Sequence, residues 1–287
     1  IKSFLCEDDY IISDDRLNVS DMPDLNKIID NLHSSGKKVI FTMGKGGVGK
    51  TTIAAAVALG LSKKGEKVHL ATTDPAAHLK FFIQEKEGIT LSYIDEEKEL
   101  ERYKIEVLSK AKESMSKEDI TYIEEDLKSP CTQEIAIFRA FANIVEKSEN
   151  EIVVIDTAPT GHTLRMLQLP SAWTNFIGEN AQGASCLGQL SGLESKREMY
   201  KKAMETLSDK RLTTLILVAR PEHVPLKEAE RASKELREIG VNNQILVING
   251  ILSSYDDDIS KGLYDKQQKS LLDFSKSFEE LTTYSIP

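Results

Sequence analysis

The sequence is poor in cysteine, in basic residues and in long apolar runs. Three cysteines are too few for a disulfide framework, and a reducing compartment is expected. No apolar run approaches the ~20 residues that a membrane-spanning helix needs, and no secretory leader is visible. Lys and Arg number 37 against 46 Asp and Glu, and the net charge of −9 argues against nucleic acid as the main partner. We therefore expect a soluble cytoplasmic protein.

Strand-like apolar runs alternate with helical stretches along most of the chain. Continuous apolar runs separated by helices are typical of a mostly parallel, doubly wound α/β sheet that is covered on both faces. Helices are expected over Leu25–Leu32, with Ser20-Asp21 as the cap, and over Thr51–Lys64. The strand candidates are 39–42, 68–72, 152–155, 215–218, 245–248 and 282–286.

Two further segments and the ends of the chain complete the expected organisation. Residues 1–20 are acidic and irregular, which is typical of a linker or tail before a domain spanning 21–287. The stretch Glu96–Lys128 is highly charged and helical, and predicts a helical insertion over about 96–150. The chain begins at Ile1 and ends at Pro287 directly after a strand candidate, so we expect it to be part of a longer polypeptide.

A glycine loop lies between the first strand candidate and the next helix. It reads GKGGVGKT and is followed by Thr52, and this is the P-loop pattern in its required context. Glycines allow successive backbone N–H groups to point at phosphates, and the helix adds its positive dipole end. Lys50 is predicted to contact the β- and γ-phosphates of ATP, and Thr51 to ligate Mg²⁺. The loop comprises Gly44, Lys45, Gly46, Gly47, Val48, Gly49, Lys50 and Thr51.

Two aspartates, Asp74 and Asp156, follow strand candidates. An aspartate in this position is often only a helix cap. The carboxyl ends of parallel strands, however, meet at the sheet edge where ligands bind, and the P-loop shares that edge. Phosphoryl transfer to water needs an oriented water molecule and Mg²⁺ held by oxygen ligands. We therefore expect both carboxylates to serve the nucleotide site.

Longer motifs give the chain a specific resemblance. The segments Thr72–Leu79 (TTDPAAHL) and Asp156–Arg165 (DTAPTGHTLR) resemble the first switch and the signature sequence of the arsenite-pump ATPase family. The segments Glu125–Thr132 (EDLKSPCT) and Gly183–Gly188 (GASCLG) are similar to parts of the same family. Lys45 resembles the second lysine of the deviant Walker A loop, which in the MinD, ParA and nitrogenase-iron-protein class reaches a partner's nucleotide across a dimer.

The resemblance implies roles by position. Asp74 would orient or activate the attacking water, and Asp74 and Asp156 would bind Mg²⁺ through water. Asn249 would bind the adenine edge, and Glu222 would lie near the nucleotide of the facing half. Part of the adenine pocket would lie beyond Pro287. The implied partners are a second ATPase half, in a homodimer or a tandem pseudo-dimer, and a separate integral membrane arsenite carrier that recruits the chain to the inner face of the membrane.

The same resemblance makes Cys131, His162 and Cys186 a site for arsenite or antimonite. Spacing alone favours ordinary buried cysteines and a loop histidine, because no CxxC pattern is present. Trivalent arsenic and antimony are thiophilic, however, and a position near a helix N-terminus, as expected for Cys131, lowers a thiol pKa. His162 lies in the loop that begins at Asp156, so a metalloid bound there would act on the phosphate site.

Two other functions remain as alternatives to the catalytic subunit of a metalloid pump. One is a targeting ATPase for tail-anchored membrane proteins, which the Glu- and Lys-rich stretch Glu96–Lys128 and the lack of cysteine in Gly250–Pro287 disfavour. The other is a ParA- or MinD-like positioning ATPase, which the lack of a visible basic or amphipathic tail disfavours.

Overall fold

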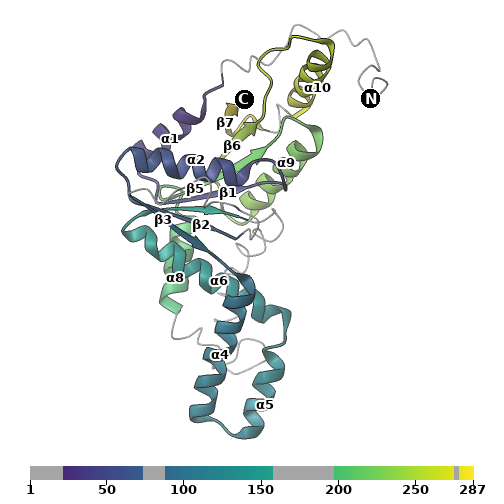
Figure 1. Ribbon diagram of the computed structural model, residues 1–287. Helices are drawn as coiled ribbons and strands as arrows, with labels where there is room; N and C mark the ends of the chain where they lie inside the picture. The colour runs from purple at the N-terminus through teal and green to yellow at the C-terminus, as the bar shows by residue number, and fades with distance from the viewer. Residues whose placement is uncertain (1–21, 74–87, 158–196, 275–277) are drawn as a thin grey trace.

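A computed structural model of the chain describes residues 22–73, 88–157, 197–274 and 278–287. These residues form a parallel sheet with helices on both faces (Figure 1), which confirms the predicted α/β class. The strand order is β3-β2-β4-β1-β5-β6-β7, and every pairing is parallel. The strands are β1 (Val39–Met43), β2 (Val68–Thr72), β3 (Ile89–Tyr93), β4 (Ile152–Asp156), β5 (Thr213–Ala219), β6 (Gln244–Asn249) and β7 (Thr282–Ile286).

Each of the six predicted apolar runs is a strand, and the structure adds β3 at one edge of the sheet. β3 escapes prediction because its sequence, ITLSY, alternates apolar and polar residues over a short length. Its polar side chains face His69 of β2, whose Nδ1 and Nε2 lie 2.7 Å from Thr90 Oγ1 and 2.8 Å from Ser92 Oγ. The buried histidine therefore ties the edge strand to the sheet.

The two faces of the sheet bury separate hydrophobic clusters. On one face α1 (Leu25–Ser34) and α2 (Lys50–Lys63) cover the strands, and Figure 1 shows both helices above the sheet. The opposite face is covered by α6 (Pro130–Glu146), α8 (Arg197–Ser208), α9 (His223–Glu238) and α10 (Asp258–Phe274). Phe41 of β1 and Phe141 of α6 stack there with ring centroids 5.3 Å apart.

The first helix begins at Leu25, as predicted, but its cap differs from the predicted one. Ser20 and Asp21 lie outside the described residues, and the N-cap of α1 is Asp24, whose Oδ1 accepts a hydrogen bond of 3.1 Å from the backbone N–H of Lys27. The predicted cap was therefore wrong. An aspartate immediately before the first helical residue satisfies an N–H group that no helical carbonyl can reach.

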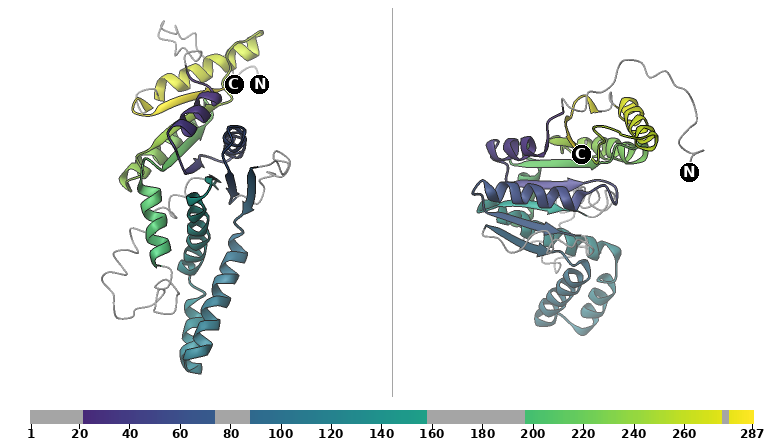
Figure 2. Two further views of the ribbon diagram at one scale, coloured as in Figure 1. Left: turned by 90° about the vertical axis from the view of Figure 1, so that its left-hand side faces the viewer. Right: turned by 45° about the horizontal axis from the view of Figure 1, so that its top comes forward.

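Two helices extend from the sheet as an arm. They are α4 (Glu96–Ser114) and α5 (Lys117–Asp126), and Figures 1 and 2 show them projecting away from the strands. The expected insertion also took in the region of α6, which the structure places on the sheet because its apolar face fills the core. A short 3-10 turn, η3 (Lys147–Glu149), joins α6 to β4. Arg139 of α6 pairs with Glu106 of α4, fastening the arm to the sheet layer.

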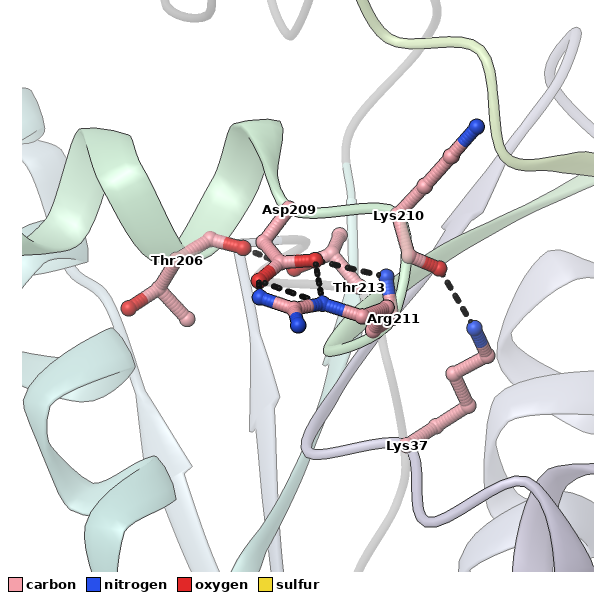
Figure 3. A network of polar contacts seen from close by, with 6 residues as sticks. All are labelled: Lys37, Thr206, Asp209, Lys210, Arg211 and Thr213. Carbon is pink, nitrogen blue, oxygen red and sulfur yellow. Dashed lines mark hydrogen bonds and ion pairs between the residues drawn. The ribbon is translucent and has the colours of Figure 1, made fainter.

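Polar contacts close the amino ends of β1 and β5 (Figure 3). Lys37 Nζ donates a hydrogen bond of 2.6 Å to the carbonyl of Lys210. The carboxylate of Asp209 accepts from the backbone N–H of Arg211 at 2.8 Å and from its guanidinium at 2.7 Å. Among the described helices, none combines the length and apolar character needed to cross a membrane.

Candidate functional site

The glycine loop lies at the carboxyl edge of the sheet, where β1 ends and α2 begins at Lys50. Its glycines take backbone angles that other residues rarely adopt, with φ of 157° at Gly44, 79° at Gly47 and 99° at Gly49. A Cβ on Gly44 would lie 2.2 Å from the carbonyl oxygen of Val218 in β5. Glycine is therefore required here both for the backbone angle and for the close approach of a neighbouring strand.

The outer side of the loop is open. A Cβ on Gly46 or Gly47 would meet no atom within 4 Å, whereas Val48 is buried beneath the loop. An anion approaching from this side meets the N-terminus of α2, where backbone N–H groups and the helix dipole favour negative charge. This shape fits a phosphate chain.

Two lysines border the opening. Lys50 is largely buried, with 8% of its surface exposed, and its Nζ donates a hydrogen bond of 3.2 Å to the carbonyl of Lys45. The ammonium group of Lys50 therefore lies beside the start of the loop. Lys45 is exposed, as is Thr52 in the first turn of α2.

Asp156 is the last residue of β4 and is fully buried. Its carboxylate accepts hydrogen bonds from Thr51 Oγ1 at 2.7 Å, Thr72 Oγ1 at 3.1 Å and Thr42 Oγ1 at 3.3 Å. Burial raises the pKa of this carboxyl above its ordinary value, although the hydroxyl donors and the charge of Lys50 oppose the shift. The site thus places a carboxylate in contact with the hydroxyl of the P-loop threonine.

This donor set fits a magnesium ion. Mg²⁺ prefers oxygen ligands, keeps several waters, and in phosphate-binding sites is held by one or two protein groups together with phosphate oxygens. Thr51 and Asp156 supply a hydroxyl and a carboxylate that already contact each other. Thr51 would bind the ion directly, and Asp156 through water.

Asn249 links β6 to the glycine loop. It ends β6, and its Nδ2 donates a hydrogen bond of 2.9 Å to the carbonyl of Val48. A Cβ on Gly49 would lie only 2.3 Å from this amide nitrogen, so the side chain lies against the loop. Glu222 is the exposed N-cap residue of α9 at the same sheet edge, and its Oε1 lies 3.4 Å from Nε of Arg220.

Several predicted residues cannot be placed. Asp74, His162 and Cys186 lie outside the described residues. Cys131 is the second residue of α6, but its side chain is also outside the described part of the chain. The proposed metalloid set therefore stays a prediction. The structure does bring Lys50, Thr51 and Asp156 together, with Asn249 beside them.

Threonines that were not predicted as site residues surround Asp156. Thr42 and Thr72 both pair in register with Asp156, on the two strands that flank β4. Thr157 Oγ1 also donates to the carbonyl of Thr42 at 2.7 Å. A signal was present, because each threonine lies at or just beyond the end of an apolar run, where parallel strands bring polar residues to a common edge.

Sequence comparisons with known proteins support a nucleotide site independently of the geometry described above. A sequence family described as "Anion-transporting ATPase" matches residues 37–287. The "Arsenical pump-driving ATPase" of Acidiphilium multivorum is 38% identical over 265 residues, which are 86% of this chain and 46% of that protein. The "Putative arsenical pump-driving ATPase 2" of Aquifex aeolicus is 33% identical over 278 residues, covering 87% and 92%. The "ATPase ASNA1 homolog" of Dictyostelium discoideum is 31% identical, covering 85% and 82%. The chain thus spans about half the length of the first relative.

Proposed function

The chain belongs to the anion-transporting ATPase family, and from that premise we propose that it hydrolyses Mg-ATP to drive the efflux of arsenite or antimonite. The observation that carries the proposal is the contact between Thr51 of the open glycine loop and the buried carboxylate of Asp156, with Lys50 lying across the same loop. Similarity to proteins named arsenical pump-driving ATPases supports the choice of cargo.

The proposed chemistry assigns each group one task. The backbone N–H groups of the loop and the Lys50 ammonium bind the β- and γ-phosphates. Thr51, with Asp156 and Asp74 through water, would hold Mg²⁺, and the ion would supply positive charge against the phosphate oxygens. Asp74 orients the attacking water. Asn249 binds the adenine edge, and its hydrogen bond to Val48 fixes the base side of the site relative to the phosphate side.

A second ATPase half is the proposed assembly partner. Lys45 is exposed at the mouth of the loop, where its side chain is available to a facing nucleotide. Glu222 is exposed at the same edge and would lie near that nucleotide as well. A separate membrane carrier is the second proposed partner, and it would hold the chain at the cytoplasmic face of the membrane.

Metalloid binding by Cys131, His162 and Cys186 is proposed to stimulate hydrolysis. α6 begins beside Cys131 and leads through η3 directly into β4, which ends at Asp156. His162 follows Asp156 in the next segment of the chain. A metalloid bound to both segments would therefore act on the chain before and after β4. This connection would couple the metalloid site to the nucleotide site.

The test is phosphate release by the purified chain. The parent should require Mg²⁺ and should be stimulated by antimonite. Asp74→Asn should bind nucleotide but turn over slowly, and Cys131→Ser should keep basal turnover but lose stimulation because a hard hydroxyl replaces a soft thiolate. An active parent that is insensitive to antimonite would contradict the pump, and equal stimulation of Cys131→Ser would contradict the metalloid site.

The targeting of tail-anchored membrane proteins is kept as a second candidate. The relevant observation is the arm, whose large exposed apolar residues among those described are Ile105, Met115 and Tyr122. They are separated by charged residues along α4 and α5, whereas an apolar client needs a continuous greasy surface. Capture of a hydrophobic transmembrane peptide, together with insensitivity to antimonite, would favour this candidate over the pump.

A further inference from the structure

The α5 helix is unusual among the described helices because it buries no residue of its own. Tyr122 projects from it with 73% of its surface exposed. A capping box between Ser116 and Asp119 starts the helix, so local bonds hold it where tertiary packing is weak. Beside Tyr122 lies an open groove of about 650 Å³, lined by Tyr122, Ile123, Glu125, Asp126, Lys128 and Ser129. We call these six residues the α5 surface.

The charge of α5 differs from that of its neighbour. Its ten residues include five acidic ones and a single lysine. On α4 the carboxylates of Glu99 and Glu106 form ion pairs with basic side chains of the same helix. In the part of the chain that the structure describes, no basic side chain forms an ion pair with Glu118, Glu124 or Glu125 of α5. Within the α5 surface, two carboxylates, Glu125 and Asp126, stand against one lysine, Lys128, so the surface combines an exposed aromatic ring with a net negative charge.

We propose that the α5 surface docks a basic cytoplasmic segment of the membrane partner, an inference that rests on the proposed function. Cytoplasmic segments of membrane proteins are enriched in Lys and Arg, so their charge complements this surface. The apolar stem of such a side chain packs on Ile123 and Tyr122, while its head group reaches Glu125 and Asp126. A cation above the Tyr122 ring gains a further attraction.

The position of the surface links docking to the ATPase core. Asp126 ends α5, and its backbone carbonyl accepts a hydrogen bond of 3.2 Å from Thr132 Oγ1 in the first turn of α6. Thr132 is buried, and its backbone N–H donates to the carbonyl of Ser129. A segment seated in the groove therefore contacts the turn that sets the start of α6, the helix that leads toward β4.

Lys128 limits what the groove accepts. It is the one cation among the lining residues, and it is exposed. It repels a cationic side chain placed at that end, so the docked segment must place its charges toward Glu125 and Tyr122. A uniformly basic, apolar-free polymer is consequently a poorer match than a segment that alternates basic and apolar residues.

The test uses a fluorescein-labelled peptide in which arginines alternate with leucines and glycines, with a second peptide that carries glutamate in place of arginine. Fluorescence anisotropy at physiological ionic strength should show binding of the first peptide only. Tyr122→Ala combined with Glu125→Gln should weaken binding about tenfold, because a cation–π contact and an ion pair are lost together. Tyr122→Phe keeps the ring and should bind like the parent.

Three results would overturn the proposal. The first is equal binding by the double variant and the parent. The second is an equal loss in Glu238→Gln, which removes an exposed carboxylate from α9 and controls for overall charge. The third is self-association of the parent that Tyr122→Ala abolishes, since the occupant would then be a second copy. ATP hydrolysis by the parent without peptide is measured in parallel. Absence of hydrolysis would contradict the proposed function. Normal hydrolysis, together with equal peptide binding by the parent and the double variant, would contradict only the docking surface.

Discussion

The two edges of the sheet differ in how they hold their polar groups. At the carboxyl edge Asp156 is fully buried and bonds to Thr51 and Thr72, which are 105 and 84 residues away in sequence. At the amino edge the partly exposed Asp209 bonds to the exposed Arg211, two residues away. Burying a carboxylate costs free energy, and a local, hydrated pair does not. The carboxyl edge therefore has features that stability alone does not require, whereas the amino edge has those of an ordinary turn.

The largest contrast is expected between Lys50 and Lys37, one lysine from each edge. Lys50→Ala removes the cation beside the phosphates and should reduce hydrolysis by about 100-fold or more. Lys37→Ala removes a hydrogen bond to a backbone carbonyl and the attraction to Asp209, both at the amino edge, and should leave hydrolysis unchanged. Phosphate release by both variants is measured at the Mg-ATP concentration that saturates the parent. Comparable losses in the two variants would erase the distinction between the edges.

Glycines at the two edges give a matched comparison of stability. Gly44→Ala combines a positive φ with a clash against the backbone of Val218, and should lower the free energy of unfolding by about 3 kcal/mol or more. Gly36 also has a positive φ, 64°, but a Cβ there meets nothing within 4 Å, so Gly36→Ala should cost about 1 kcal/mol. Urea denaturation of both variants measures the difference, and equal costs would mean that β5 yields to the new methyl group.

Asp156→Asn should have opposite effects on stability and on ligand binding. Because burial raises the pKa of this carboxyl, the ionised form destabilises the ligand-free fold, and that cost appears as pH rises through the raised pKa. The neutral amide avoids the cost, so the variant should melt higher than the parent at neutral pH and should bind Mg-nucleotide more weakly. Thermal melting with and without Mg-ATP tests both signs. A variant that melts lower without ligand would show that the three threonine hydroxyls outweigh the burial cost.

The smallest effect is expected from Asp209→Asn at the amino edge. Hydrogen bonds from Arg211 lower the pKa of Asp209 to about 2. The ionised carboxylate therefore stabilises the fold fully at pH values above the ordinary pKa of an aspartate. That contribution is lost as pH falls through the folded pKa. The melting temperature of the variant should therefore be slightly lower at neutral pH and converge with the parent near pH 2. A difference that persisted there would mean that the turn matters for reasons other than charge.

Much of the sheet could be predicted because its strands are central, apolar and continuous. Ile152–Asp156 and Thr213–Ala219 are buried along their whole length, and such runs between helices predict parallel strands. The edge strand Ile89–Tyr93 could not be predicted, because it is short and only partly apolar. Its polar residues hydrogen-bond to a histidine that lies about twenty residues earlier, and this contact is visible only in the structure. The limit between the arm and α6 was also not predicted. The sequence shows that α6 has an apolar face, but only the structure shows that this face packs on the sheet.

The candidate site could be predicted where a motif carries its own geometry. The glycine loop, Lys50 and Thr51 follow one another in sequence, so the motif defines them together. The contacts of Asn249 with Val48 and of Thr42 and Thr72 with Asp156 depend on strand order and register, which the sequence does not state. Their identification required the structure.

The most direct test of the account is calorimetric titration of the parent chain with a non-hydrolysable ATP analogue, with and without Mg²⁺. The account predicts binding that Mg²⁺ strengthens, that Lys50→Ala abolishes and that Lys37→Ala leaves intact. Binding that is indifferent to Mg²⁺ and unchanged in Lys50→Ala would show that the carboxyl edge of the sheet is not a magnesium–nucleotide site, and would contradict the account at its centre.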